Sequence, residues 1–270
     1  MTEAASRFVG SIPQIYDTGL GPVIFEGYAA DMAERAARAG AGAVLELAAG
    51  TGIVSRKLRD RLSPAARLVA TDLNPPMLEL AARKFRPDEA VEFRPADAMQ
   101  LPFGDASFDL VVCQFGVMFF PDKRASFREV WRALRTGGRY LLNVWGPMAA
   151  NPFAQIAFDV GARVMPDNPP VFYRVPFSYA DPSVVQSDLA SAGFEDVRFE
   201  VVRLSKPVED WTPFAHALVH GNPFIEEIGR RPEISTETVV AAVEDALRER
   251  LGPAPALMPL EAIVFEARKP

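Results

Sequence analysis

Residues 44–145 alternate short apolar runs with amphipathic stretches, and this alternation constrains the fold more than any other feature. Apolar runs bounded by turn residues predict strands, and helical spacing between them predicts helices. Strands that alternate with helices form a parallel sheet covered on both faces. The expected strands are residues 43–47, 67–71, 91–94, 108–114 and 140–145, and the expected helices are 53–62, 75–85 and 124–134, the last capped by Gly137-Gly138.

The pattern changes after residue 145, where proline and aromatic residues become frequent. A helix is expected at 184–192, and strands at 197–204 and 262–267. The sequence therefore predicts a Rossmann-like α/β fold: a seven-stranded, mostly parallel sheet with helices on both faces and a cap formed by insertions. The expected parts are a helical segment that covers the cofactor site (1–40), the cofactor-binding core (41–145), cap insertions that form the acceptor pocket (146–181 and 206–259) and the remaining helix and strands of the core (182–205 and 260–270).

Composition narrows the possible partners. The apolar share of 49% and the charged share of 24% are typical of a soluble globular protein. A net charge of -6 argues against nucleic acid as the main partner, since phosphate backbones require a basic surface. The single cysteine, Cys113, excludes an intramolecular disulfide, and its apolar run favours a buried strand residue over a nucleophile. We find no secretory signal and no apolar stretch long enough for a membrane span, so we expect a cytoplasmic protein.

The end of the first strand carries a glycine loop, Gly50-Thr51-Gly52. Glycines there allow a tight turn and let a ligand approach the backbone closely. Asp72, at the end of the second strand, is placed to accept hydrogen bonds from both hydroxyls of a ribose. These features fit NAD as well as an adenosyl cofactor, and the glycines alone fit a simple tight turn.

Three details separate the two cofactors. Ser55 stands where the dinucleotide fingerprint requires its third glycine. Glu46 lies inside the first strand, where a buried carboxylate would anchor the glycine loop and favour a cationic ligand; a partly exposed strand residue is the alternative. Asp97 follows the third strand and can accept a hydrogen bond from an adenine amino group, although a helix N-cap would also use it. The implied cofactor has a ribose, an adenine and a positive charge, and no phosphates.

Four segments carry a resemblance to a known family: VLELAAGTG, ATDLNPPML, FRPADAMQLPFGDASFDLVVCQFGVMFF and EVWRALRTGGRYLLNVW. In order and spacing they resemble the class I S-adenosylmethionine-dependent methyltransferases, especially the ubiquinone/menaquinone-biosynthesis-like (type 11) small-molecule enzymes. The resemblance is strong over residues 10–145 and weak over the last strands. It implies S-adenosyl-L-methionine as cofactor and methyl transfer, by in-line displacement at the sulfonium, to a small-molecule acceptor.

The resemblance also implies which residues bind the cofactor. They lie at or near the carboxyl ends of the expected strands, with one N-terminal tyrosine over the cofactor: Tyr16, Glu46, Ala48, Gly50, Thr51, Gly52, Asp72, Leu73, Met77, Asp97, Ala98, Cys113, Gln114 and Phe115. Glu46, Ala48 and the glycines would line the methionine and ribose side, and Asp72 would hold the ribose. Ala48 departs from the family, whose members often carry a polar or small acidic residue there.

The same resemblance places the adenine and the methionyl group. Leu73 and Met77 would pack the adenine, and Asp97 with Ala98 would bind its edge. Gln114 and Phe115 would lie beside the methionyl part, with the Cys113 carbonyl accepting a hydrogen bond from its amino group. Packing within an N-terminal helix is the alternative for Tyr16.

The sequence defines the methyl acceptor and a possible general base less clearly than it defines the cofactor. His216 and His220 share one helix face, but no third ligand completes a metal site, so we expect no metal. Packing or surface positions are favoured for both, and a general base remains open. The aromatic insertions predict a small, apolar or aromatic acceptor held near Tyr173, Phe177 and Tyr179.

Two other functions remain open at this point. An NAD-dependent oxidoreductase would use the same glycine loop and Asp72, and a non-catalytic binding module would keep the fold without the reaction. The sequence does not determine the oligomeric state, and a dimer paired through the cap is one option.

Overall fold

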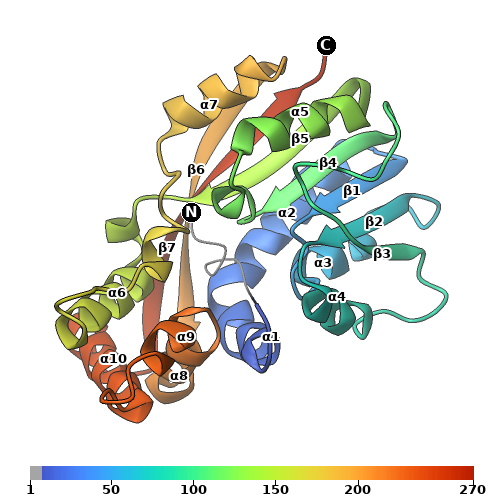
Figure 1. Cartoon of the computed structure of the whole chain (residues 1–270). Helices are drawn as coiled ribbons and strands as arrows, with labels where there is room; N and C mark the ends of the chain where they lie inside the picture. Colours follow the sequence, from blue (N-terminus) through green and yellow to red (C-terminus); the bar gives the residue numbers. More distant parts are fainter. Residues whose placement is uncertain (1–7) are drawn as a thin grey trace.

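The computed structural model describes residues 8–270, and its centre is one seven-stranded sheet (Figure 1). The strand order is β3-β2-β1-β4-β5-β7-β6. β1 to β5 run parallel, and β7 runs antiparallel to both of its neighbours. This confirms the predicted mostly parallel sheet. The strands are β1 (Ala43–Leu47), β2 (Arg67–Asp72), β3 (Val91–Pro95), β4 (Phe108–Gln114), β5 (Leu134–Trp145), β6 (Glu195–Val208) and β7 (Ala256–Arg268).

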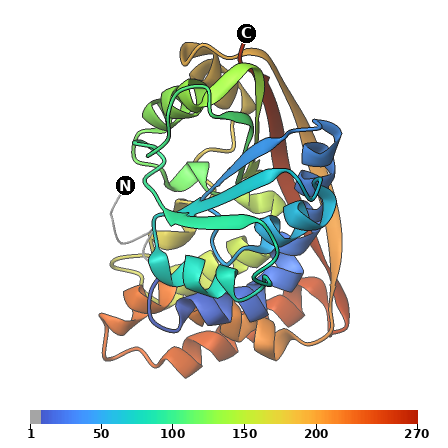
Figure 2. The same cartoon turned by 90° about the vertical axis from the view of Figure 1, so that its right-hand side faces the viewer.

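Helices cover both faces of this sheet, as Figure 2 shows after a quarter turn. Val44 and Val112 of the strands pack with α2 and α3, whereas Leu45 and Val111 face the side of α5 and α7. The helices are α1 (Ile12–Ile15), the π-helix η2 (Tyr16–Phe25), α2 (Glu26–Arg38), α3 (Ile53–Arg61), α4 (Pro75–Ala82), η3 (Val117–Phe119), α5 (Lys123–Ala133), η4 (Met148–Ala150), α6 (Pro152–Val164), η5 (Phe172–Arg174), α7 (Pro182–Ser191), α8 (Trp211–His220), α9 (Phe224–Gly229) and α10 (Thr236–Leu251).

Both predicted insertions form one helical lobe below the sheet in Figure 1. β6 and β7 stay paired from Val202–Ala262 down to Val208–Ala256, past the point where β7 leaves β5. This two-stranded ribbon carries α8, α9 and α10, and α6 of the first insertion packs against α10. The strands therefore take up both ends of the segment 206–259 that we expected to be cap.

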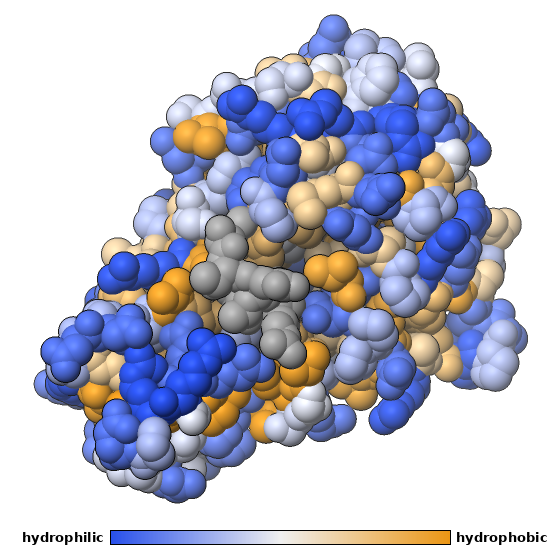
Figure 3. Space-filling model, viewed as in Figure 1, coloured by the Kyte–Doolittle hydropathy of each residue, from blue (hydrophilic) through white to orange (hydrophobic). Residues whose placement is uncertain are grey.

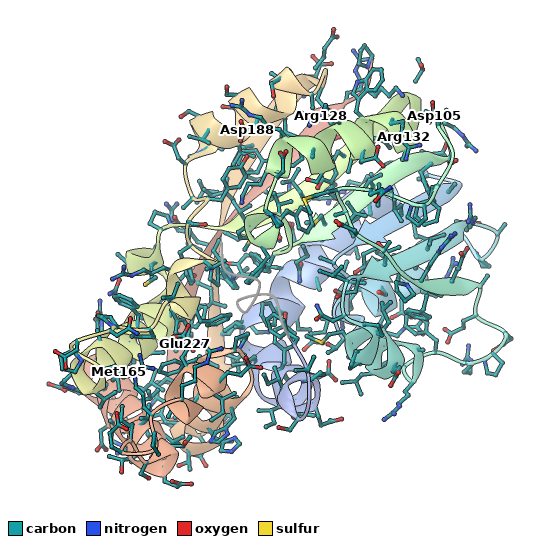
Figure 4. The ribbon with its side chains drawn as sticks, in the orientation of Figure 1. Asp105, Arg128, Arg132, Met165, Asp188 and Glu227 are labelled. Carbon is teal, nitrogen blue, oxygen red and sulfur yellow. The ribbon has the colours of Figure 1, made fainter. Side chains whose placement is uncertain are left out.

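The two insertions are joined to each other by Glu227, which Figure 4 labels in this lobe. Its two carboxylate oxygens accept hydrogen bonds from the backbone N–H groups of Val171 and Phe172, at 2.9 and 3.0 Å. Because α9 and the segment at η5 belong to different insertions, this contact fixes one against the other.

One local prediction is wrong. Helix α5 ends at Ala133 without a glycine cap, and the chain enters β5 at Leu134. Gly137 and Gly138 instead lie inside β5, where the pairing with β4 shifts register. Gly137 has a φ of 79°, and a Cβ on Gly138 would lie 2.8 Å from a backbone carbonyl oxygen. The two glycines therefore allow the irregular backbone at this register shift in β5, and they do not cap α5.

Among residues 8–270, no helix has the length and apolar character needed to cross a membrane. On the face seen in Figure 3, apolar surface gathers near the centre, between the lobe and the sheet. Hydrophilic residues cover most of the two ends.

Candidate cofactor and acceptor site

A cavity of about 270 Å³ lies at the carboxyl ends of β1, β2 and β4. This is the edge where open α/β sheets bind ligands. Ten residues predicted from the sequence line it: Tyr16, Ala48, Gly50, Asp72, Leu73, Met77, Asp97, Ala98, Gln114 and Phe115. Phe8, Asn74 and Met99, which the sequence pattern does not single out, also line it, and so do Thr71, Ala96, Gly116, Phe119, Phe120 and Pro121.

Asp72 ties the glycine loop to the end of β2. Its carboxylate oxygens accept hydrogen bonds from the backbone N–H groups of Gly50 and Asn74, at 2.9 and 2.8 Å. Burial raises the pKa of this carboxyl group, and the backbone donors oppose that shift. Oδ1 also accepts a 3.2 Å hydrogen bond from the side-chain amide of Asn74, whereas Oδ2 can accept a second hydrogen bond, so Asp72 can still receive a ribose hydroxyl.

Glu46 is buried inside β1, with 1% of its surface exposed, which excludes the partly exposed alternative. Its Oε2 accepts a hydrogen bond of 2.6 Å from the hydroxyl of Ser55. The missing third glycine is thus replaced by a residue that orients this carboxyl group. Burial raises the pKa of Glu46 to about 8, so a neighbouring positive charge would strongly favour its ionised form.

Glu46 borders a small cavity that continues from the larger one and is also lined by Tyr16, Phe25, Thr51 and Gln114. The Oε1 of Gln114 is buried and has no hydrogen-bond partner among the described residues. A buried unpaired acceptor calls for a donor. The carboxyl of Glu46 and this amide oxygen together fit the ammonium and sulfonium charges of S-adenosylmethionine.

The backbone around the cavity is shaped for close approach. Ala48 and Phe115, each just past a strand end, both have a φ of 51°, a conformation that costs energy for residues other than glycine. A Cβ on Gly116 would lie 2.5 Å from the Cβ of Ala48. This tight contact gives a reason for the glycine at position 116.

Two predicted cofactor residues do not line the cavities described here. Gly52 has a φ of 79°, and a Cβ there would lie 2.8 Å from the Cβ of Ala81. Its role is to let α3 begin closely packed on α4. Cys113 is buried within β4, where the pKa of its thiol is raised by burial to about 12. That is the strand-core position favoured by its apolar run.

The π-helix η2 forms a lid over these cavities. Tyr16 and Phe25 stand at its two ends, nine positions apart. In an α-helix that spacing covers about two and a half turns, so the two side chains would point to opposite sides. Here their rings stack with centroids 4.7 Å apart, and both line the cavity beside Glu46. The wider π-helical turn is therefore what brings both aromatics onto the site, a use typical of π-helical segments.

A second, aromatic cavity of about 60 Å³ adjoins the first. Phe8, Tyr16, Phe115 and Phe119 line both. The ring of Phe115 stacks on Trp145 at a centroid distance of 3.9 Å, at the ends of β4 and β5. The remaining wall comes mainly from the lid and the cap: Leu20, Ile24, Phe25, Phe153, Phe172, Tyr173, Pro176, Phe177, Leu218 and Asn222.

Two of the three predicted acceptor-pocket residues line this cavity, Tyr173 and Phe177. Tyr179 does not. Its hydroxyl donates a 2.7 Å hydrogen bond to Asp188 of α7, labelled in Figure 4, and Arg124 holds the other oxygen of that carboxylate. Tyr179 therefore anchors the first insertion to the core, through a partner that the sequence pattern does not reveal.

The histidines lie away from the cavities. The imidazole rings of His216 and His220 stack on each other, 4.2 Å apart, and neither lines a cavity described here. The neighbouring Leu218 faces the aromatic cavity instead. The geometry thus favours the packing and surface positions over a general base. Among residues 8–270, no cluster of three or more histidine, cysteine or acidic side chains is arranged to hold a metal.

Comparison with known proteins agrees with this geometry. A family model described as "Methyltransferase domain" matches residues 45–142. The demethylmenaquinone methyltransferase of Thermus thermophilus is 34% identical over 170 residues, which cover 59% of this chain and 76% of that protein. The demethylmenaquinone methyltransferase of Deinococcus radiodurans is 39% identical over 114 residues. That match covers 42% of this chain and only 47% of the Deinococcus protein.

A solved structure shows the same fold. The phosphoethanolamine N-methyltransferase 2 of Haemonchus contortus, in complex with S-adenosyl-L-methionine, superimposes with a TM-score of 0.58 at 18% identity. The alignment covers 96% of this chain and 56% of that one. The sheet order, the polar cavity at the strand ends and the match with the Thermus relative lead to one conclusion: the chain belongs to the class I S-adenosylmethionine-dependent methyltransferases of the type 11 kind.

Proposed function

We propose that the chain transfers the methyl group of S-adenosylmethionine to a planar, apolar acceptor of the quinone kind. The observation that carries this proposal is the aromatic cavity, which shares Tyr16, Phe115 and Phe119 with the polar cavity. Two ligands in these cavities would meet at the shared wall. Apolar pockets with few polar groups are typical of small-molecule sites.

The class of acceptor rests on chemistry and on relatives. Flat aromatic walls such as the Phe115–Trp145 stack favour a ring that can stack on them. The similar proteins from Thermus and Deinococcus are named demethylmenaquinone methyltransferases, so their acceptor is a quinone-type ring. For this chain we propose the same class, with carbon as the methylated atom.

In this proposal the cofactor supplies a methyl group already activated by its sulfonium. The chain binds the ribose through Asp72, faces the positive charge with Glu46, and closes the site with Tyr16. Aromatic side chains exclude water and hold the acceptor ring in line with the methyl group. Such positioning can contribute several kcal/mol to lowering the barrier.

The aromatic cavity offers no base for proton removal. Among its described lining residues the titratable groups are the hydroxyls of Tyr16 and Tyr173, and burial raises both of their pKa values. The acceptor must therefore be reactive by itself. An electron-rich hydroquinone ring carbon meets this need, whereas an unactivated alcohol does not.

The test is a direct assay of methyl transfer. Purified protein is incubated with S-adenosylmethionine and either a demethylnaphthohydroquinone or its oxidised quinone, and S-adenosylhomocysteine and methylated ring are measured by mass spectrometry. We expect both products with the hydroquinone and little with the quinone. Methyl transfer to non-aromatic acceptors only, with no aromatic compound methylated, would contradict the proposed acceptor class.

Titration with NAD addresses the remaining enzymatic alternative. We expect binding of S-adenosylhomocysteine and none of NAD. Binding of NAD alone would overturn the proposal, and cofactor binding without turnover across a broad acceptor panel would favour a non-catalytic module.

A further inference from the structure

One carboxylate on the lid reaches two parts of the core. Asp17 follows Tyr16 in η2, and its Oδ1 accepts a 2.6 Å hydrogen bond from the hydroxyl of Thr51 in the glycine loop. The ammonium of Lys84, just after α4, binds the same oxygen. Both ionic side chains are partly buried, with 15% of Asp17 and 26% of Lys84 exposed.

This contact gives the hydroxyl of Thr51 a partner on the lid, whereas the family resemblance implies a role for Thr51 in binding the cofactor. Its hydroxyl is used by the lid, although the residue does line the small cavity beside Glu46. The loop that shapes one side of the cofactor cavity is thus fastened directly to the helix that covers it.

Three other charged residues line a surface groove of about 230 Å³ beside Asp17 and Lys84, and each of them is paired with a residue other than Asp17. Lys57 of α3 binds Glu26 at 2.9 Å, and Arg56 binds Asp60 and Glu89. Of the two carboxylates that line this groove, Asp17 binds Thr51 of the glycine loop and Lys84, and Glu26 binds Lys57 of α3. Glu26 therefore provides a matched control.

Asp17 is the neighbour of Tyr16 in the first turn of η2. Tyr16 lines all three cavities, and its ring stacks on Phe25 at the other end of the π-helix. If Asp17 were released, the first turn of η2 would lose its anchor to the glycine loop and to Lys84. Tyr16 would then be free to move off the cavity beside Glu46.

We propose that Asp17 is a positioning residue that clasps the lid to Thr51 and Lys84 and thereby sets how long the cofactor stays bound. The inference rests on the proposed cofactor site, under Tyr16 and beside Glu46. Release of the cofactor from this side requires the clasp to open. The clasp is partly ionic, so added salt weakens it and shortens the bound lifetime.

The test measures the dissociation rate of S-adenosylhomocysteine by stopped-flow competition, first for the natural protein. We expect Asp17→Asn to raise this rate about five- to tenfold, since one charge-assisted contact is lost. Glu26→Gln removes a carboxylate charge of the neighbouring pair and should change the rate less than about twofold. Melting temperatures of both variants show whether either is simply destabilised.

A charge exchange distinguishes a clasp from a general structural role. We expect Lys84→Asp to raise the rate as Asp17→Lys does, and the double variant to recover much of the slow dissociation. Equal rates for Asp17→Asn, Glu26→Gln and the natural protein would overturn the clasp. A natural protein that binds no S-adenosylhomocysteine would instead overturn the proposed cofactor site, so the two failures remain distinguishable.

Discussion

The two cavities that meet at Phe115 are built in opposite ways. The polar cavity and the small cavity that continues from it take Glu46, Gly50 and Asp72 from β1, from β2 and from the loop after β1, within 27 residues of the chain. The aromatic cavity takes its wall from the lid, the end of β5 and both insertions, with Ile24, Trp145 and Leu218 far apart in the chain. One is a product of local motifs, and the other of tertiary packing.

This difference implies different tolerance to change. The polar cavity relies on a few hydrogen bonds to buried carboxyl groups, and losing one partner leaves the other unsatisfied. The aromatic cavity spreads its binding over many side chains, each of which contributes contact area. We therefore expect single substitutions to abolish cofactor binding but only to weaken acceptor binding.

The largest expected effect is at Asp72. Asp72→Ala removes the carboxylate that would accept a hydrogen bond from a ribose hydroxyl, and it removes the partner of the Gly50 N–H group. We expect the Kd for S-adenosylhomocysteine to rise about 100-fold or more. Isothermal titration calorimetry measures it. Glu92→Gln, on an exposed β3 carboxylate paired with Arg67, serves as control and should leave Kd unchanged. A tenfold or smaller change for Asp72→Ala would place the ribose elsewhere.

The next largest effect is expected at Phe177, which lines the aromatic cavity. Phe177 stacks on Trp145, and Phe177→Ala should lower kcat/KM for the acceptor about tenfold through lost apolar contact, with the cofactor Kd unchanged. Phe199→Ala on the exposed side of β6 is the matched control. Unchanged acceptor turnover in Phe177→Ala would remove this cavity from the acceptor site.

A smaller, pH-dependent effect is expected at Glu46. With a pKa of about 8, this carboxyl group is protonated in the folded apo protein near neutral pH, and a cationic cofactor favours its ionised form. As the pH is raised towards 8, the affinity for S-adenosylmethionine should increase by up to about tenfold per pH unit, and above pH 8 it should level off. Below pH 8, binding should release a proton. Calorimetry in buffers of different ionisation enthalpy measures the released proton.

The same group affects stability in the opposite direction. Its pKa in the folded protein lies above the ordinary value of about 4.5, so the stability it contributes is full below about pH 4.5 and is lost as the pH rises towards 8. Glu46→Gln should flatten both pH profiles. Some slope should remain, because burial also raises the pKa of Asp72. A pH-independent affinity in the natural protein would exclude the proton-linked site.

The smallest effect is expected at the histidines. Because His216 and His220 contact each other outside the cavities, the double change to alanine should alter kcat less than about twofold. Steady-state kinetics across pH 6 to 8 checks this. A loss of more than tenfold, rescued by added imidazole, would restore a histidine base to the mechanism.

The comparison also explains how much could be predicted from the sequence. Hydrophobic alternation predicted the strands of the sheet, and the acids at strand ends together with the resemblance to the type 11 methyltransferases predicted most of the polar cavity, because these signals are local. The pattern also predicted that Glu46 is buried, although its partner Ser55 was recognised only as a missing glycine.

The remaining errors share a physical cause. The π-helix η2 packs against α8 of the cap and α3 of the core, and the spacing of its residues in the sequence does not predict a π-helix. Tyr179 was expected in the pocket because it is aromatic, yet a distant carboxylate, Asp188, decides where its hydroxyl points. Local sequence patterns do not predict contacts between segments that are far apart in the chain.

The β6–β7 ribbon has an evolutionary consequence. Both insertions leave the core from β5, β6 and β7, which occupy one side of the sheet, whereas β2 and β3 form the other. Residues can be added, lost or exchanged beyond the ribbon without disturbing the register of β1 with its neighbours. A change in the insertions can therefore alter the wall of the aromatic cavity while the strand ends around the polar cavity stay as they are.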